Sequence, residues 1–555
     1  MFPRLLLSFV ALVSVASAQP VIAHRGVVNA ASFTPHGAPG GAIPRGGLFS
    51  IFGQNLGPAA PAQVSVFPLE NAFQGVSIRV TQGSQSVNAI PIFVSAGQIN
   101  ALMPSNTPLG WNSLRVSFGG TEGGPVPVFV ADHALGIFTA TGAGMGPGVI
   151  QNVNSESDRP INSPAATARP RQVVILWATG LSPITAPDNQ APPAADLPLP
   201  VEILVGGARV TNKLYSGRSP CCAGVDQIAF EVPPEAPAGC YVPVLIRIGS
   251  RVSNGVMMAI SPNGGACSDP DNPLVAPFVS GQRLGILELT RISLFLDTGV
   301  NQIRRAAVDR FAALFQKQTG GQFAFNPMIA LPPPGACTAY TASGYILGGV
   351  VNPFAARSAG LNAGTLTLTG TAGTVTHQGQ QIGAGRFYNA IAAGPTVTIP
   401  AGGPDPAIFF EPGNYVLRAS GGPDVGAFET NVAIEPPLVW TNRDSLASVD
   451  RAQGVRFEWN ASPKGRAVVG GSAYDMPTDT STVFVCVAPA GALSFQVRPE
   501  VLANILPARP QRHQSIHNLF FATAPAGAAV PFTAAGLDSA AVIHKTVTYK
   551  SVRFR

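Results

Sequence analysis

Two histidines in the C-terminal half have a spacing that could bind a metal ion. His513 and His517 are four residues apart, so on a helix both imidazoles would lie on one face and could ligate the same ion. No acidic residue lies between or near them, and Pro507 and Pro510 precede them. We therefore expect surface histidines and not a metal site.

Acidic side chains in the same half could support two other kinds of chemistry. Two facing carboxylates can hydrolyse a glycosidic bond, and the candidates are Glu411, Asp424, Glu429 and Glu458. Aspartates can bind calcium, and the candidates are Asp424, Asp444 and Asp450. These aspartates lack the D-x-D-x-D spacing of a calcium loop. We expect neither site, and an exported hydrolase or polysaccharide-binding protein with its site in the C-terminal domain is the alternative function.

Aromatic and glycine-rich segments add no further active site. Trp440 and Trp459 could stack on sugar rings, but aromatic residues of β-sandwiches usually belong to the core. The segment Gly142–Gly148 is glycine-rich, yet Pro147 and the missing helix make it a linker and not a phosphate-binding loop. The sequence also lacks the G-x-S-x-G, H-E-x-x-H and Walker motifs. We predict no catalytic residue, no cofactor and no metal, and hence no enzyme.

Six cysteines indicate disulfide bonds formed in an oxidising compartment. They are Cys221, Cys222, Cys240, Cys267, Cys337 and Cys486. The last two are the only cysteines of the C-terminal half, so we predict that they pair. Adjacent cysteines rarely bond to each other, so the first two are each expected to take one of the next two, in an order left open. A zinc site is the alternative, but no C-x-x-C spacing or nearby histidine supports it.

The N-terminus has the pattern of an export signal. Arg4 precedes the apolar stretch Leu5–Val15, and Ala16-Ser17-Ala18 gives the small-x-small pattern of a cleavage site. We predict a signal peptide over residues 1–18, with cleavage after Ala18. The stretch is too short to span a bilayer, and no transmembrane segment is expected after its removal. The protein is therefore expected to be secreted, either extracellular or in the periplasm and cell envelope.

The composition favours a β-rich, multi-domain protein. Of 555 residues, 61 are Gly and 53 are Pro, while 46% are hydrophobic and only 11% are charged. So many apolar residues exclude intrinsic disorder of the charged, apolar-poor kind, and so many prolines exclude a coiled coil. The net charge is +6, but the 34 basic residues form no run of five. Because nucleic-acid surfaces cluster their positive charge, we expect no nucleic acid as a partner.

An internal repeat occupies the first half of the chain. Leu48–Pro58 matches Val173–Pro183 at an offset of 125 residues, and each copy is an apolar strand that enters a glycine-containing turn. Gln98–Pro104 matches Gln227–Pro233 at an offset of 129 residues. The second copy therefore carries four extra residues, which we place around Cys221 and Cys222.

Alternating apolar and polar residues between Gly and Pro turns predict that each copy is a β-sandwich of the immunoglobulin-like kind. The predicted repeats are residues 19–140 and 141–265. Gly53 and Gly180, which lie in the repeated turns, are expected to supply backbone with positive φ.

Four motifs of this region resemble a bacterial family. They are Val28–Phe33, Ile51–Gly57, Gln98–Asn100 followed by Pro104, and Ala178–Leu181. Together they resemble the Solibacter uncharacterised C-terminal domain family of secreted acidobacterial proteins, over residues of about 21–262. Each half also resembles an IPT/TIG-type immunoglobulin-like unit. The resemblance implies secretion and tandem sandwiches, and it implies no catalytic residue because the family has no established activity.

The C-terminal half lacks the repeat. Residues 266–330 are predicted to be a linker with an amphipathic helix over Val300–Gln318, capped by Asp297 or Thr298. Residues 331–555 show strand and turn patterns and are predicted to form a further β-sandwich. We expect a secreted or cell-surface β-sandwich protein with a structural, adhesive or ligand-binding role. Its partner would be an extracellular protein or a polysaccharide.

Overall fold

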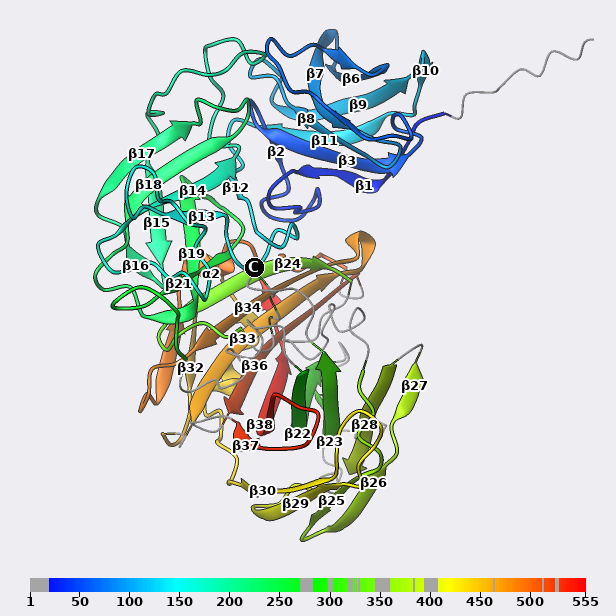
Figure 1. The fold of residues 1–555 in the computed structure, drawn as a ribbon, viewed down its shortest axis with the longest axis vertical. Coiled ribbons are helices and arrows are strands. Elements are labelled where there is room, and N and C mark those ends of the chain that lie inside the picture. Colours follow the sequence, from blue (N-terminus) through cyan, green and yellow to red (C-terminus); the bar gives the residue numbers. More distant parts are fainter. Residues whose placement is uncertain are drawn as a thin grey trace, which may run out of the picture.

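The computed structural model of the chain consists almost entirely of β-strands, which confirms the predicted fold class. It describes residues 19–555 except 270–282, 298–302, 318–322, most of 323–329, 345–359, 383–384, 394–407, 463–464, 512–513 and 525–528. The predicted signal peptide, its cleavage site after Ala18 and His513 lie outside the described residues. Three β-units follow one another, and the second lies beside both of the others (Figure 1).

The first unit is a two-layered sandwich. Its strands are β1 (Val21–Asn29), β2 (Ile43–Pro44), β3 (Leu48–Gln54), β4 (Ala62–Gln63), β5 (Ala72–Phe73), β6 (Val76–Gln82), β7 (Gln85–Val94), β8 (Gln98–Leu102), β9 (Gly110–Phe118), β10 (Thr121–Glu122) and β11 (Val126–Ala131). Their order is β1-β3-β8-β7-β6-β9-β11-β2, and β7 joins the layers because it pairs with both β6 and β8. Alternate residues such as Ile51, Ile78, Ile99 and Leu114 fill the core between the layers.

The second unit repeats this plan with two separate sheets. Its strands are β12 (Gly136–Ile137), β13 (Ile150–Asn152), β14 (Val173–Thr179), β15 (Val201–Val205), β16 (Ala208–Arg209), β17 (Lys213–Arg218), β18 (Asp226–Glu231), β19 (Gly239–Ile248), β20 (Arg251–Val252) and β21 (Val256–Ile260). One sheet has the order β12-β14-β18-β17 and the other β16-β15-β19-β20. A core of buried aliphatic residues lies between them.

The structure bears out the repeat residue by residue. Phe52 of β3 pairs with Gln98 of β8, and Trp177 of β14 pairs with Gln227 of β18, which are equivalent positions at offsets of 125 and 129. Three residues, 95–97, join β7 to β8, whereas seven, 219–225, join β17 to β18. The four-residue insertion therefore lies in the loop that holds Cys221 and Cys222, as the spacing predicts.

The repeated turn has positive φ at one shared position, and it is not Gly53. Asn55 has φ 55° and Gly180 has φ 92°, and these two residues are equivalent at the offset of 125. Gly53 is instead required by a close contact, since a Cβ there would lie 2.1 Å from the carbonyl oxygen of Val21. Asparagine is the residue that replaces glycine most readily in left-handed backbone, so both copies keep the same turn.

The third unit is built on a ten-stranded sheet of order β24-β34-β33-β36-β38-β22-β23-β28-β27, with β37 beside β38. The bounds are β22 (Arg283–Asp297), β23 (Ile303–Lys317), β24 (Cys337–Ser343), β27 (Gln380–Ile382), β28 (Gly385–Ala393), β33 (Arg466–Asp475), β34 (Thr480–Val487), β36 (Ser515–Ala524), β37 (Val530–Phe532) and β38 (Ser539–Ser551). A four-stranded sheet packs against β22, β23 and β28 across an apolar core, as the predicted C-terminal sandwich requires.

Smaller elements complete the third unit. The four-stranded sheet has the order β26-β25-β29-β30, and two strand pairs stand apart, β31 with β39 and β32 with β35. The bounds are β25 (Leu366–Gly370), β26 (Gly373–His377), β29 (Gly413–Ala419), β30 (Phe428–Ile434), β31 (Ser448–Val449), β32 (Val455–Glu458), β35 (Ser494–Val497), β39 (Arg553–Phe554), α2 (Pro499–Leu502), η3 (Arg443–Ser445) and η4 (Met476–Thr478).

The predicted amphipathic helix over Val300–Gln318 is wrong, because Ile303–Lys317 forms the strand β23. It pairs along its whole length with β22, which in turn pairs in parallel with β38. Phe311, Ala313 and Phe315 are buried at every second position, as a strand requires. The range 266–330, predicted as a linker with a helix, thus supplies the two longest strands of the ten-stranded sheet.

Side chains from all three units fix their arrangement. Tyr241 and Met257 of the second unit pack into one apolar cluster with Val485 and Tyr549 of the ten-stranded sheet. The first unit reaches the third through Arg25, whose Nη1 donates to the carbonyl oxygen of Thr478 at 3.3 Å. Among the described residues, no helix has the length and apolar character needed to cross a membrane.

Candidate functional site

All six cysteines form disulfides, and the predicted bond between Cys337 and Cys486 is confirmed. These two residues face each other across β24 and β34, with their Cα atoms 4.0 Å apart. The bond therefore ties an edge strand to the interior of the ten-stranded sheet.

The predicted pairing of the other four cysteines is wrong. Cys240 bonds to Cys267, and Cys221 bonds to its neighbour Cys222. Cys240 packs against the third unit in the cluster that contains Tyr241, whereas the loop with Cys221 and Cys222 lies against the first unit. Since these places have different neighbours, the adjacent cysteines find no partner but each other.

Three of the acidic residues singled out in the sequence have structural partners. Glu429 pairs with Arg418 at 2.8 Å, and Glu458 pairs with Arg456 at 2.8 Å. Asp424 accepts a hydrogen bond from the backbone N–H of Asn362. None of these residues, nor Glu411, lines a pocket described below. Within the described ranges, no three His, Cys, Asp or Glu side chains gather in a way that could hold a metal ion.

Trp440, Trp459 and His517 are buried. Trp440 and Trp459 are 4% and 3% exposed, and Trp440 stacks on Phe457 with ring centroids 5.1 Å apart. They are core residues and cannot stack on a sugar. His517 lies inside β36 and is 5% exposed, so the expectation of a surface histidine is wrong. Burial is the main cause that lowers the pKa of His517 to about 4, and the nearby charge of Arg553 lowers it further.

A pocket of about 450 Å³ lies where the first and second units meet, and we call it the repeat-junction pocket. Its lining residues are Leu48, Gln63, Val64, Ser65, Val66, Phe67, Leu69, Ile92, Phe93, Asn100, Cys221, Cys222, Ala223 and Val225. None of them carries a charge. The volume falls within the usual range for small-ligand sites.

The walls of this pocket are held by bonds between the two units. The hydroxyl of Thr179 accepts from the backbone N–H of Leu48 and donates to the carbonyl oxygen of Gly224, beside the disulfide loop. Leu69 and Asn189 exchange two hydrogen bonds between their units, one of them through the Asn189 side chain. The pocket is therefore preformed, as binding sites for small ligands usually are.

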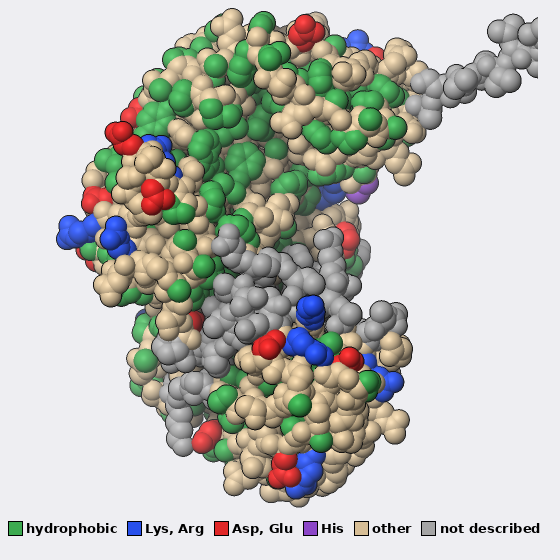
Figure 2. Space-filling view, in the orientation of Figure 1, with side chains coloured by type: hydrophobic (Ala, Val, Ile, Leu, Met, Phe, Trp, Pro, Cys, Tyr) green, Lys and Arg blue, Asp and Glu red, His purple; other side chains and the backbone are tan. Residues whose placement is uncertain are grey.

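The pocket combines apolar surfaces with two amide groups. Phe67 is 41% exposed and Val66 is 70% exposed at its rim, and the disulfide of Cys221 and Cys222 forms part of its wall. Gln63 and Asn100 supply amides that can form hydrogen bonds. Figure 2 shows hydrophobic side chains gathered over the two repeat units, with few charged ones among them. Such a site suits an uncharged ligand with an apolar face.

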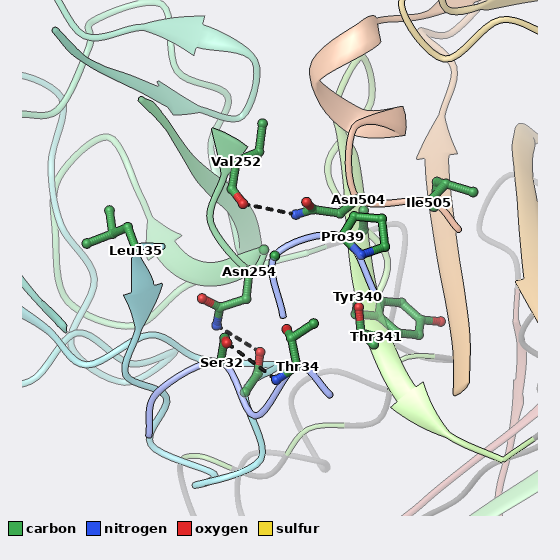
Figure 3. Close-up of a pocket in the computed structure, with 14 residues that line it drawn as sticks. Ser32, Thr34, Pro39, Leu135, Val252, Asn254, Tyr340, Thr341, Asn504 and Ile505 are labelled. Carbon is green, nitrogen blue, oxygen red and sulfur yellow. Dashed lines mark hydrogen bonds between the residues drawn. The ribbon is translucent and has the colours of Figure 1, made fainter. Parts of the chain in front are cut away.

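A much smaller cavity lies at the junction of all three units (Figure 3). It holds about 10 Å³, which is room for about one water molecule. Asn504 of the third unit donates to the carbonyl oxygen of Ser253 at 2.8 Å, and Asn254 donates to that of Gly144 at 2.9 Å. This cavity is part of a structural joint and is too small for a ligand.

Comparisons with known proteins give only weak likenesses. No family model and no curated protein sequence matches the chain. Among solved structures, a protein of unknown function from Bacteroides thetaiotaomicron VPI-5482 has a TM-score of 0.15 at 10% identity, over 54% of this chain and 58% of that one. Domains 5–6 of the S-layer protein SbsC have a TM-score of 0.17 at 10% identity, over 44% of this chain and 98% of that one.

A third likeness is to SGBP-B from a complex xyloglucan utilization locus in Bacteroides uniformis, with a TM-score of 0.16 at 12% identity. It covers 67% of this chain and 86% of that one. TM-scores this low do not establish a shared fold, so none of these likenesses supports an inference about function.

Proposed function

We propose that the chain is an exported β-sandwich protein, extracellular or attached to the cell envelope, that binds a ligand and catalyses no reaction. Six cysteines that are all paired support an oxidising compartment. We also propose, from the sequence motifs, that residues of about 21–262 belong to the Solibacter uncharacterised C-terminal domain family.

The observation that carries the binding function is the repeat-junction pocket. It is preformed between two sandwiches, and no charged side chain lines it. A neutral saccharide matches this chemistry, because a sugar ring has an apolar face that packs on Phe67 and hydroxyl groups that bond to Gln63 and Asn100. Charged ligands would lose their hydration in such a pocket without gaining a partner.

The test uses the exported form of the chain on an array of neutral glycans, followed by titration calorimetry with each glycan that binds. Phe67→Ala is expected to weaken binding about tenfold, because it removes a stacking ring. Leu493→Ala is the matched control, since Leu493 is also exposed and lies outside the pocket. The proposal fails if no neutral glycan binds, or if both variants bind as tightly as the unmodified protein.

The alternative is an exported hydrolase with its site in the third unit. Release of reducing sugar from a bound glycan would identify it and would contradict a role without catalysis. The ion pairs of Glu429 and Glu458 do not favour this alternative, since both carboxylates already have an arginine partner.

A further inference from the structure

A second pocket, of about 430 Å³, lies in the third unit near β31 and β39, and we call it the arginine pocket. Its lining residues are Ala447, Ser448, Ala508, Arg509, Ser515, Ile516, His517, Ser551, Val552, Arg553 and Arg555. Three of them are arginines, and none has an acidic side chain. This is the opposite chemistry to the uncharged repeat-junction pocket.

Within the part of the chain that the structure describes, Arg509 is the one arginine of this pocket that pairs with an acidic side chain. Arg509 binds Asp475 through two hydrogen bonds, the second of 2.9 Å from its Nη2. The side chain of Arg553 donates to a backbone carbonyl, that of Arg509, at 3.4 Å. No acidic side chain among the described residues pairs with the Arg553 guanidinium.

Further positive charge surrounds the same place. Arg451 donates to the carbonyl oxygens of Ala503 and Ile505, and its Nε donates to a backbone oxygen of Arg555, the last residue of the chain. Arg25 of the first unit interacts with Asp475 as well. Asp475 is thus one carboxylate shared by arginines from two units.

His517 also lines this pocket and is buried. Its Nδ1 accepts a hydrogen bond from the backbone of Phe554, and its buried Nε2 has no partner. Burial and the nearby Arg553 and Arg451 lower the pKa of this imidazole, and Asp475 only partly opposes them. The histidine is therefore neutral at pH 7.

We propose that the arginine pocket binds the anionic group of a small molecule, a carboxylate or a phosphate. The guanidinium of Arg553 would form charge-assisted hydrogen bonds to it, and the hydroxyls of Ser448 and Ser551 would donate further bonds. The volume accommodates a ligand about the size of a sugar acid. This site is separate from the repeat-junction pocket and doesn't depend on a ligand there.

The test is titration calorimetry of the exported form of the chain at low ionic strength with inorganic phosphate, glucuronate and glucose. We expect both anions to bind. Any binding of glucose should have the same affinity in the pocket variants as in the unmodified protein. Arg553→Gln should weaken anion binding about tenfold or more, since hydrogen bonds between charged groups are the strong ones. Tighter binding of glucuronate would indicate a sugar carboxylate, and tighter binding of phosphate a phosphate ester.

Two further variants keep the test independent of folding. Ser448→Glu places a negative charge at an exposed position of the pocket and should abolish anion binding, while Arg553→Lys should keep part of it. Arg418→Gln is the matched control, because Arg418 is an exposed arginine on another sheet. The proposal is overturned if neither anion binds, or if Ser448→Glu binds them as tightly as Arg418→Gln does.

Discussion

Among the described residues, Arg218 and Asp226 form the most fully buried ion pair. Arg218 is 2% exposed and Asp226 is fully buried. Burial raises the pKa of the Asp226 carboxyl, and the guanidinium of Arg218 and the N–H of Leu181 oppose that rise. Arg218 also donates to the carbonyl oxygen of Ser182, so the pair holds the repeated turn in place.

Arg218→Met should therefore destabilise the second unit strongly. The change leaves Asp226 buried without a countercharge, and breaking such a pair costs about 3–5 kcal/mol. Urea unfolding followed by circular dichroism measures the loss. Arg456→Met is the control, because Arg456 and Glu458 form an exposed pair whose loss should cost under about 1 kcal/mol. Equal losses in both variants would contradict the structural role of the buried pair.

Two buried histidines predict a loss of stability in mild acid. Burial, Arg553 and Arg451 lower the pKa of His517 to about 4, although Asp475 raises it in part. Burial and Arg291 likewise lower the pKa of His544 to about 4, although Asp309 raises it in part. The unfolded chain protonates histidine near pH 6.5, so between pH 6.5 and 4 it binds more protons than the folded chain. Stability is full above this window and falls through it, by on the order of 3 kcal/mol for each residue.

The measurement is the urea midpoint at pH 7, 5.5 and 4. A variant with His517→Gln and His544→Gln should show a flatter pH dependence, whatever its stability at pH 7. His24→Gln, at an exposed position, should leave the dependence unchanged. A double variant with the same slope as the unmodified protein would assign the acid sensitivity to other groups.

At the scale of elements, β23 shows why sequence patterns can mislead. Phe311 and Phe315 are four residues apart, a spacing that places two side chains on one face of a helix and also on one face of a strand. Alanine, arginine and glutamine in the same stretch favour a helix. In the fold, Asp309 stabilises the strand. Its carboxylate binds Arg291 of β22 and accepts hydrogen bonds from the backbone N–H groups of Phe409 and Phe410. These contacts come from segments that no local pattern reveals.

An isolated peptide of residues 303–317 should accordingly be helical. Its intrinsic preference is for helix, and the neighbours β22 and β28 that make it a strand are absent from the peptide. Circular dichroism in water and in trifluoroethanol checks this, with a growing minimum near 222 nm as the expected result. A peptide that forms only β-structure in both solvents would show that the strand is encoded locally.

The repeat and the pocket differ in how far the sequence could predict them. Strand positions in the first two units follow from local alternation and turn residues. The offsets of 125 and 129 residues therefore predict which strand pairs are equivalent, as Phe52 with Gln98 in the first unit and Trp177 with Gln227 in the second. The repeat-junction pocket forms only where residues 63–69 of one unit meet residues 221–225 of the next. The four-residue insertion was the one sequence signal at this place, and it gave no hint of the facing wall.

At the scale of the whole molecule, many small contacts join the three units. Asn504 bonds to the second unit, Arg25 bonds to the third, and one apolar cluster contains residues of both the second and third units. Both pockets therefore lie on a frame whose parts hold one another in place. The arginine pocket depends on this frame as well, since Arg25 of the first unit faces the Asp475 that pairs with Arg509.

The disulfides should contribute very unequally to the stability of this frame. Cys337 and Cys486 are 149 residues apart in sequence, so their bond removes chain entropy from the unfolded state worth about 5 kcal/mol. Cys221 and Cys222 are adjacent, and their bond closes no comparable loop. Replacing the first pair by alanine should lower the urea midpoint of the third unit markedly, measured by fluorescence of the buried Trp440 and Trp459. Replacing the second pair by alanine is the matched control and should leave that midpoint unchanged, and an equal shift in both variants would contradict the entropic role.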